Sequence, residues 1–135
     1  MPTNERDTPK APIAGHLVLV VDDDEAIGEL IAMALVQTGI WVSVAHSGRD
    51  ALERARQHRP DLVVLDLSLP DATGEAIANS LRRRCGPMPI VLVSAQDRPS
   101  VARAADAVHA ERFFTKPFDV DALENAVSQV LATCS

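Results

Sequence analysis

The chain has 135 residues, of which 47% are hydrophobic and 24% charged, and its formal net charge at pH 7 is −6. This length allows one domain with a single core rather than two domains, and the composition is that of a folded protein rather than a disordered segment. The acidic balance argues against nonspecific nucleic-acid binding as the main activity, and no apolar stretch approaches the ~18 residues that a membrane span needs.

The N-terminal third of the chain predicts a tail, a strand and a helix. Residues 1–15 hold three prolines and no apolar periodicity, which predicts a flexible tail. Residues 16–21 form an apolar run typical of a buried strand, and Asp22, Asp23 and Asp24 follow it. From Glu25 apolar residues recur at helical spacing, and Gly39 is expected to end this helix. The predicted inner stripe consists of Ile27, Leu30, Ile31, Ala34 and Leu35.

The middle of the chain repeats this order. Residues 41–45 alternate with small polar residues, which predicts a strand near the edge of a sheet. Ser47, with Asp50 three positions on, resembles a capping box and opens a helix that ends before Pro60. Residues 62–65 are then uniformly apolar, as in a strand buried on both faces, and the run ends in Asp66.

The C-terminal half adds two further units. A helix over residues 75–84 ends in three arginines, which we interpret as a solvated terminus that complements the helix dipole rather than as a binding patch. A buried strand over residues 89–94 ends in a hydroxyl, and Ser100 is expected to cap the next helix. The last strand, residues 112–116, ends in a lysine, and the closing helix starts near Asp119.

Five alternating strands and helices predict an α/β fold, a doubly wound five-stranded parallel sheet with helices on both faces. Right-handed crossovers place the carboxyl ends of all five strands on one rim. This rim collects the polar residues that end the strands, namely Asp22, Asp23, Asp66, Ser94 and Lys116. In open α/β sheets ligands bind at that rim.

The residues on the rim indicate a metal and phosphate chemistry. Three neighbouring carboxylates repel one another unless a cation intervenes, and Mg²⁺ prefers carboxylate oxygens together with water and phosphate oxygens. Asp66 could then attack a phosphoryl group as a nucleophile. Lys116 would supply a second positive charge, and the Ser94 hydroxyl could donate a hydrogen bond to a phosphoryl oxygen.

Four blocks of the sequence, in order and at the right separations, resemble the receiver domain of two-component response regulators. They are Val20-Val21-Asp22-Asp23-Asp24-Glu25, Asp61-Leu62-Val63-Val64-Leu65-Asp66-Leu67-Ser68-Leu69-Pro70, Val91-Leu92-Val93-Ser94-Ala95 and Phe113-Phe114-Thr115-Lys116-Pro117-Phe118. The resemblance covers about residues 16 to 132, so we expect a receiver domain over residues 16–135. It implies a flavodoxin-like sheet with strand order 2-1-3-4-5 and a cis bond between Lys116 and Pro117.

The resemblance also assigns roles to individual residues. It implies that Asp66 is the phosphoacceptor, and that Ser94 and Lys116 contact the phosphoryl group. Magnesium ligands are expected from Asp22, Asp23, Asp66 and the backbone carbonyl of Ser68. Ser94 and Phe113 would form the conformational switch, although phenylalanine departs from the tyrosine frequent there. Asp24 and Glu25 are interpreted as helix-dipole residues, and His109-Ala110 departs from the usual Gly-Ala before the last strand.

The leading hypothesis is therefore a signalling switch that catalyses only its own phosphorylation and dephosphorylation and is otherwise not an enzyme. The expected partners are a sensor histidine kinase or a histidine phosphotransfer protein and a downstream protein target or effector domain, with no direct nucleic-acid or membrane contact by this domain. The output stays open between a stand-alone regulator, a relay intermediate and a module of a longer chain. Ser68 and Gln96 are expected to border the path of the hydrolytic water.

The alternative is a small phosphatase of the haloacid dehalogenase type. Asp22 and Asp24 superficially fit the opening motif of that family, with Asp22 as the nucleophile. However, Ala26 stands where that motif has threonine or valine, and no cap insertion or late acid pair follows.

The cysteines indicate a reducing compartment, and neither the cysteines nor the histidines indicate a metal site. Cys85 and Cys134 have neither metal-ligand spacing nor the density of a disulfide-rich secreted fold, and no signal-peptide pattern opens the chain. We therefore expect free thiols and a cytoplasmic location. The four histidines have no paired spacing and are expected to face solvent.

Overall fold

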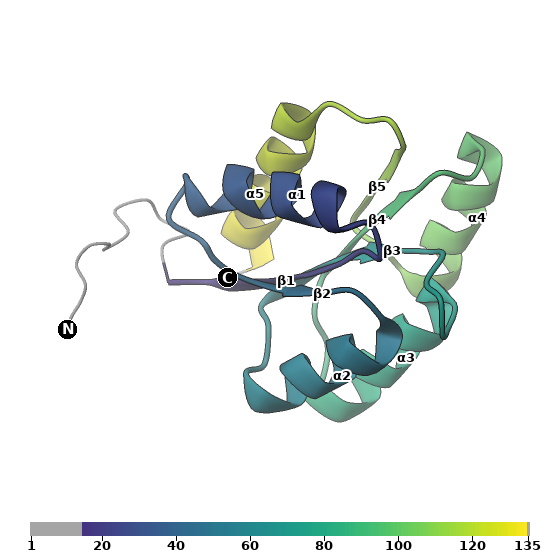
Figure 1. The fold of residues 1–135 in the computed structure, drawn as a ribbon, viewed down its shortest axis with the longest axis horizontal. Helices are drawn as coiled ribbons and strands as arrows, with labels where there is room; N and C mark the ends of the chain where they lie inside the picture. Colours follow the sequence, from purple (N-terminus) through teal and green to yellow (C-terminus); the bar gives the residue numbers. More distant parts are fainter. Residues whose placement is uncertain (1–14, 135) are drawn as a thin grey trace.

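The structure is a computed structural model that describes residues 15–134, so the predicted N-terminal tail lies, except for Gly15, outside the described residues. Strands and helices alternate strictly within residues 15–134 (Figure 1). The elements are β1 (Leu17–Val21), α1 (Glu25–Val36), β2 (Trp41–Ala45), α2 (Gly48–Gln57), β3 (Leu62–Asp66), α3 (Gly74–Cys85), β4 (Ile90–Ser94), α4 (Arg98–Val108), β5 (Arg112–Thr115) and α5 (Val120–Cys134).

The strands form one parallel sheet in the order β2-β1-β3-β4-β5. Helices α1 and α5 cover one face, and α2, α3 and α4 cover the other (Figure 1). This arrangement confirms the doubly wound fold, the flavodoxin-like strand order and the edge position of the strand over residues 41–45. The bond between Lys116 and Pro117 is cis, as expected.

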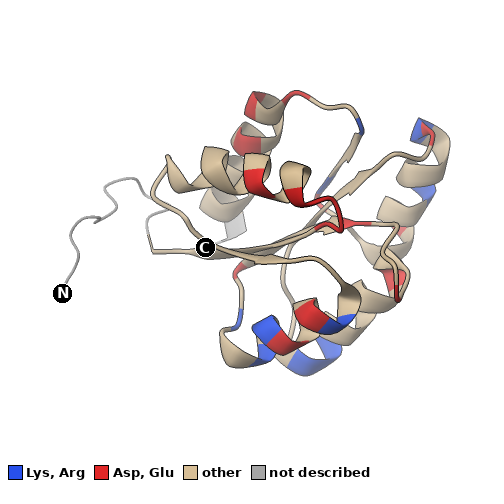
Figure 2. Ribbon diagram, viewed as in Figure 1, with Lys and Arg blue, Asp and Glu red and all other residues tan. Residues whose placement is uncertain are grey.

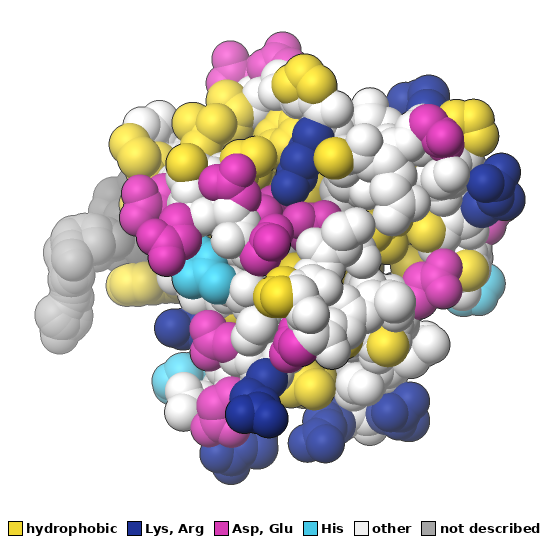
Figure 3. Space-filling view, turned by 45° about the vertical axis from the view of Figure 1, so that its right-hand side comes forward, with side chains coloured by type: hydrophobic (Ala, Val, Ile, Leu, Met, Phe, Trp, Pro, Cys, Tyr) yellow, Lys and Arg dark blue, Asp and Glu magenta, His cyan; other side chains and the backbone are white. Residues whose placement is uncertain are grey.

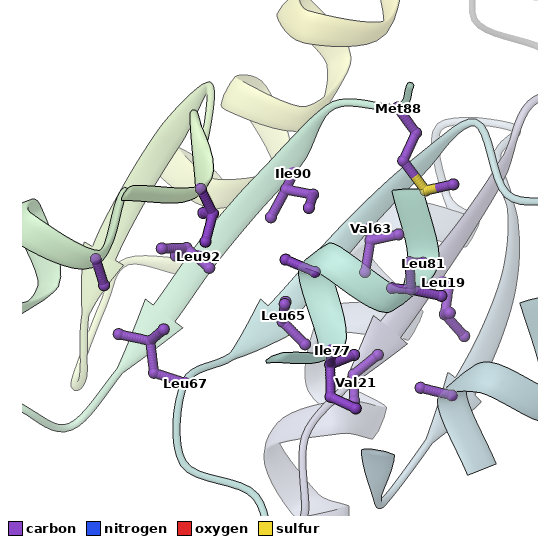
Figure 4. Close-up of a cluster of buried hydrophobic side chains, with 14 of the residues drawn as sticks. Leu19, Val21, Val63, Leu65, Leu67, Ile77, Leu81, Met88, Ile90 and Leu92 are labelled. Carbon is purple, nitrogen blue, oxygen red and sulfur yellow. The ribbon is translucent and has the colours of Figure 1, made fainter. Parts of the chain in front are cut away.

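Two apolar cores sandwich the sheet, because successive side chains of a strand point to opposite faces. In β1, Val18 and Val20 pack toward α1 and α5, while Leu19 and Val21 pack toward α2 and α3. Every residue of β3 and β4 is buried, which explains why these strands read as continuous apolar runs. Figure 4 shows the core on the side of α2, α3 and α4, where Ile77 and Leu81 of α3 contact the side chains of β1, β3 and β4.

Two predicted helix features are wrong. Leu30 belongs to the predicted inner stripe of α1, yet it is 49% exposed; the helix packs through Gly28, Ile31 and Leu35 instead. The cap of α4 is Asp97 rather than Ser100, because the Asp97 carboxylate accepts a hydrogen bond from the Ser100 amide at 2.9 Å. Ser100 therefore lies inside the helix, whose first turn also holds Pro99.

The arginines that end α3 do not form a uniformly solvated terminus. Arg82 turns inward and donates to the carbonyl oxygens of Met88 and Val108, so it ties α3 to the start of β4 and the end of α4. Its partial burial lowers the pKa of its guanidinium. Arg83 and Arg84 are exposed, as predicted. The interpretation of the run as solvated is therefore wrong for Arg82.

His109 stands where a glycine is usual before the last strand, and it adopts the backbone conformation that favours glycine. His109 caps α4 in the left-handed region with φ 55°, and its amide donates to the carbonyls of Ala105 and Asp106.

Among residues 15–134 no helix is long and apolar enough to cross a membrane.

Candidate functional site

The carboxyl ends of the strands bring the predicted polar residues to one rim. Asp66 is the last residue of β3, and Asp22 and Asp23 directly follow β1, the neighbouring strand. Ser94 ends β4, and Lys116 directly follows β5. The Lys116 amide donates to the Ser94 carbonyl at 2.7 Å, which continues the pairing of β4 with β5 to the rim.

Three carboxylates meet at the centre of this rim. Asp22, Asp23 and Asp66 each offer an oxygen, and these oxygens all lie within 4.8 Å of one another. Asp22 and Asp66 are buried, with 0% and 3% exposure, whereas Asp23 is exposed. The cluster therefore has a buried base and one side open to solvent. Figure 2 shows acidic residues at this end of the sheet, where α1 begins.

Lys116 bridges the two buried carboxylates. Its Nζ lies 2.9 Å from Asp22 Oδ2 and 3.1 Å from Asp66 Oδ2. Burial alone would lower the pKa of Lys116, but the attraction of Asp22 and Asp66 outweighs it, and the pKa of Lys116 is raised. Lys116 therefore stays protonated and holds a permanent positive charge against Asp66.

The surroundings of Asp66 favour its neutral form. Burial is the largest influence and raises the pKa of Asp66, and the negative charge of Asp22 acts in the same direction. The Ser68 amide, which donates to Asp66 Oδ1 at 3.1 Å, and Lys116 oppose this rise without cancelling it. A further cation at the site would stabilise the carboxylate form.

Asp22 provides a direct test of whether these residues fit a metal ion. Its Oδ1 accepts a hydrogen bond from the Asp24 amide, but Oδ2 is buried and accepts no hydrogen bond among the described residues. Oδ2 instead forms an ion pair with Lys116 Nζ at 2.9 Å. A buried carboxylate oxygen with an unused lone pair, beside two further carboxylates, suits a hard oxygen-seeking cation.

The loop between β3 and α3 holds Ser68 beside the site. Ser68 pairs with Thr73 as an isolated bridge, and Gly74 donates to the Leu67 carbonyl at 2.9 Å, so the loop is closed on itself. The Gln96 side chain reaches across from the loop after β4 to within 3.4 Å of the Ser68 hydroxyl. Ser68 and Gln96 thus lie next to each other beside the site, and their place along the path of the hydrolytic water stays a prediction.

Ser94 and Phe113, the predicted switch pair, come from adjacent strands. Ser94 is fully buried, and its hydroxyl accepts a hydrogen bond from the Gln96 amide at 3.0 Å. Phe113 is half-buried against the core formed with α4. The guanidinium carbon of Arg98 lies 4.9 Å from the centre of its ring, a cation–π contact that the sequence did not indicate.

Two neighbours of the site have structural roles. Asp24 is the N-cap of α1, where its side chain accepts from the Ala26 and Ile27 amides, in agreement with the helix-dipole interpretation. His46 is half-buried and its Nδ1 lies 2.9 Å from the Asp22 carbonyl, so the prediction that it faces solvent is wrong. Its position at the end of β2, next to β1, explains this contact.

Sequence reasoning missed two residues that shape the loop around Ser68. Gly74 lies so close to β3 that a Cβ atom there would come 2.8 Å from Leu67 Cα and 3.0 Å from the Asp66 carbonyl. Asp71 accepts hydrogen bonds from the amides of Gly48 and Arg49 at 2.8 and 3.0 Å, and so caps α2 from the loop. These bonds lower the pKa of Asp71. The Pro70-Asp71 turn signal marked the loop but not this long-range cap.

Comparison with known proteins agrees with this geometry. The family model described as "Response regulator receiver domain" matches residues 18–128. The chain is 36% identical over 104 residues to the probable transcriptional regulatory protein TcrX of Mycobacterium tuberculosis, covering 77% of this chain and 44% of TcrX. It is 33% identical over 114 residues to the alkaline phosphatase synthesis transcriptional regulatory protein PhoP of Bacillus subtilis, covering 84% and 48%. The chain therefore spans about half the length of these curated relatives.

A solved structure gives the same result for the fold. The receiver domain of the Francisella response regulator 1452 superposes with a TM-score of 0.81 at 26% identity, over 90% of this chain and 100% of that one. No comparison supports the alternative phosphatase, and the structure gives a physical reason. Asp24, the second acid of that motif, caps α1 instead.

Proposed function

Because this chain belongs to the response regulator receiver domains of two-component signalling, we propose that it carries its signal as an acyl phosphate on Asp66. The observation that supports this assignment is the position of Asp66 at the end of the central strand, beside a fixed cation. Asp66 ends a central strand, faces the rim and has Lys116 3.1 Å away. Asp22 shares this lysine but follows β1, which lies one strand further from β5.

The proposed reaction is transfer of a phosphoryl group from a phosphohistidine. One Asp66 carboxylate oxygen attacks phosphorus, the phosphorus–nitrogen bond breaks, and the leaving imidazole recovers its proton from solvent. Lys116 stays charged throughout and neutralises the phosphoryl oxygens, as its raised pKa supports. The Ser94 hydroxyl, buried at the end of β4, would donate to one of these oxygens after leaving its contact with the Gln96 amide.

The carboxylate cluster supports a magnesium requirement. Asp22, Asp23 and Asp66 with the Ser68 backbone carbonyl would hold Mg²⁺, which when bound supplies charge neutralisation for the carboxylates and the transferring phosphoryl group. The hydrogen-bond vacancy at Asp22 Oδ2 supports this ligand set.

Phosphorylation is proposed to act through Ser94 and Phe113. Movement of the Ser94 hydroxyl toward the phosphoryl group would vacate space beside β5, and the half-buried ring of Phe113 could then turn inward. Such a turn must break the contact with Arg98, because the guanidinium lies over the ring in its present position. The surface of α4, β5 and α5 would change and be read by a downstream target or effector domain.

The donor is proposed to be a sensor histidine kinase or a histidine phosphotransfer protein, and the location cytoplasmic. The chain's acidic balance supports partners other than nucleic acid for this domain. Apart from its own phosphorylation and dephosphorylation, we propose no catalytic activity.

The assignment of Asp66 is tested by incubating the protein with Mg²⁺ and acetyl phosphate and locating the acyl phosphate by mass spectrometry. We expect one phosphoryl group on Asp66, no labelling of Asp66→Asn, and labelling of the control Asp24→Asn, which alters only the α1 cap. Full labelling of Asp66→Asn, or a label on Asp22, would show that the nucleophile is wrongly assigned.

A further inference from the structure

Basic residues gather on the helices α2 and α3, away from the acidic rim (Figure 2). Seven of the eleven lysines and arginines within residues 15–134 belong to these helices or their ends: Arg49, Arg54, Arg56, Arg59, Arg82, Arg83 and Arg84. Figure 3 shows basic side chains along the lower edge of the molecule, with hydrophobic and acidic side chains among them. Arg82 turns inward, and Arg54 and Arg56 are paired with Asp50 and Glu53 of α2, so the unpaired positive charge of this face comes from the other four.

This face is hollowed by a groove between α2 and α3. Two adjoining hollows of about 420 Å³ and 280 Å³ share Leu52, Arg56 and Arg84, so they form one continuous groove. Its floor is apolar, with Leu52, Ala55, Ile77 and Leu81, and its borders carry Arg49, Arg56, Arg59 and Arg84. Neither hollow is lined by Asp22, Asp66, Ser94 or Lys116, so the groove is separate from the phosphoryl site.

Two acids beside the groove are already engaged. Glu53 is paired with Arg56 at 2.7 Å and takes up the charge of that arginine, and both Asp71 oxygens accept amides of the α2 N-terminus. Arg59 is fixed across the far end by hydrogen bonds to the Cys85 and Pro87 carbonyls. Arg84 is exposed and makes no hydrogen bond or ion pair with any residue from 15 to 134. Its guanidinium is therefore available to a ligand.

We propose that this groove binds an acidic segment of a partner protein, with an apolar side chain on its floor and flanking carboxylates at Arg84 and Arg49. The apolar floor gains from burying a side chain, and guanidinium groups match carboxylates bidentately. A nucleic acid fits less well, because its sugar–phosphate backbone has no apolar side chain to place on the floor. Charge complementarity selects an acidic protein segment.

The test uses a fluorescein-labelled helical peptide of leucines flanked by glutamates, titrated by fluorescence anisotropy. We expect saturable binding that weakens with salt and about a tenfold loss of affinity in Arg84→Glu. The matched control is Arg83→Glu, which makes the same charge change one residue away on α3 but lies outside the groove and contacts only Ser80. For this control we expect less than about a threefold loss.

The contribution of the floor is tested by Leu52→Ser, which should weaken binding without changing its salt dependence. Equal losses in Arg83→Glu and Arg84→Glu would overturn the proposal, as would equal binding of a peptide with lysines in place of glutamates. Displacement of the peptide by duplex DNA at matched charge would show a general polyanion surface instead.

Acetyl phosphate labelling should be unchanged in all three variants, which verifies their folding. In the wild type, peptide-induced amide shifts in NMR spectra should concentrate in α2 and α3; shifts confined to α4, β5 and α5 would also overturn the proposal.

Discussion

At the residue scale, Asp66 shows how position controls the chemistry of a common side chain. An aspartate on the surface has no cause to hold a raised pKa, but Asp66 is buried at the end of β3 and faces the charge of Asp22. Lys116 keeps a positive charge within 3.1 Å of it. The same contacts that make the ionised form costly also prepare the site for a metal and a phosphoryl group.

Gly74 illustrates a residue whose importance lies in what it lacks. A Cβ atom there would press on the backbone of Leu67 and Asp66, neither of which can move without displacing the end of β3. We predict that Gly74→Ala lowers the free energy of unfolding by about 1–3 kcal/mol. Acetyl phosphate labelling of Asp66 should also slow.

This prediction is measured by urea unfolding and by the initial rate of labelling. Glu75→Ala, an exposed change one residue further along the same helix, serves as the control and should alter stability by less than about 0.5 kcal/mol. A Gly74→Ala protein as stable and as rapidly labelled as the control would contradict the steric argument.

At the scale of elements, the loop from β3 to α3 links the phosphoryl site to α2. Asp71 satisfies two amides at the N-terminus of α2, a task that a helix's own N-cap usually performs in part. Ser47, the N-cap of α2, accepts only the Asp50 amide. In a complete capping box the Asp50 side chain would also accept a hydrogen bond from the Ser47 amide. Here the Asp50 carboxylate forms an ion pair with Arg54 instead.

We predict that Asp71→Ala lowers the urea midpoint at pH 7. Hydrogen bonds to the Gly48 and Arg49 amides hold the pKa of Asp71 below its usual value, so its contribution is present above the unfolded pKa of about 4 and is lost as the pH falls through the folded pKa. The difference between wild type and Asp71→Ala should therefore shrink on acidification. A difference that stays constant from pH 7 to pH 3 would exclude the charged cap, and Asp71→Asn, which retains an acceptor oxygen, should lose less at pH 7.

The arginines that end α3 show that one run of identical residues can divide into separate roles. Arg82 turns toward the core and binds carbonyl groups before β4 and at the end of α4. Arg83 is exposed and contacts Ser80, and Arg84 borders the groove between α2 and α3. Successive helical residues are rotated by about 100°, so neighbours in the sequence face different surroundings. The three cannot be interpreted as one unit.

At the scale of the whole molecule, charge is separated. The helices α1 and α5 carry acids and no lysine or arginine, while α2 and α3 carry most of the arginines together with three acids (Figure 2). The acidic rim destabilises the metal-free protein, because its carboxylates repel one another. Asp66 has a raised pKa, so its favourable contribution is present below the unfolded pKa of about 4 and is lost as the pH rises through the folded value.

Magnesium should therefore stabilise the protein at neutral pH. At a concentration of about 100 times its dissociation constant, a ligand of the folded state adds about 2.7 kcal/mol. We predict such a gain for the wild type and its loss in Asp22→Asn, measured by thermal unfolding with and without Mg²⁺. In metal-free buffer Asp66→Asn should be more stable than the wild type at pH 7 and should lose this advantage near pH 3. As the control, Asp24→Asn should show the same rise in stability with Mg²⁺ as the wild type. An equal rise in Asp22→Asn would show that Asp22 is not a magnesium ligand.

The order of elements and the contents of the rim follow from the sequence alone. Apolar runs with abrupt polar ends identify buried parallel strands, and chain direction then places Asp22, Asp66, Ser94 and Lys116 on one edge without any knowledge of packing. The four motif blocks added the strand order and the cis bond at Pro117 by resemblance, and the structure has both.

Only the tertiary structure decided which side of each element meets a neighbour. Leu30 fits a helical stripe, yet the sheet accepts Gly28 and Ile31 instead, and Asp97 caps α4 although Ser100 also suits a cap. Asp71, Gly74 and Arg98 act through contacts with residues distant in the chain, which no local pattern encodes. Periodicity and strand ends are local properties, whereas burial and capping across elements depend on the packing of the whole chain.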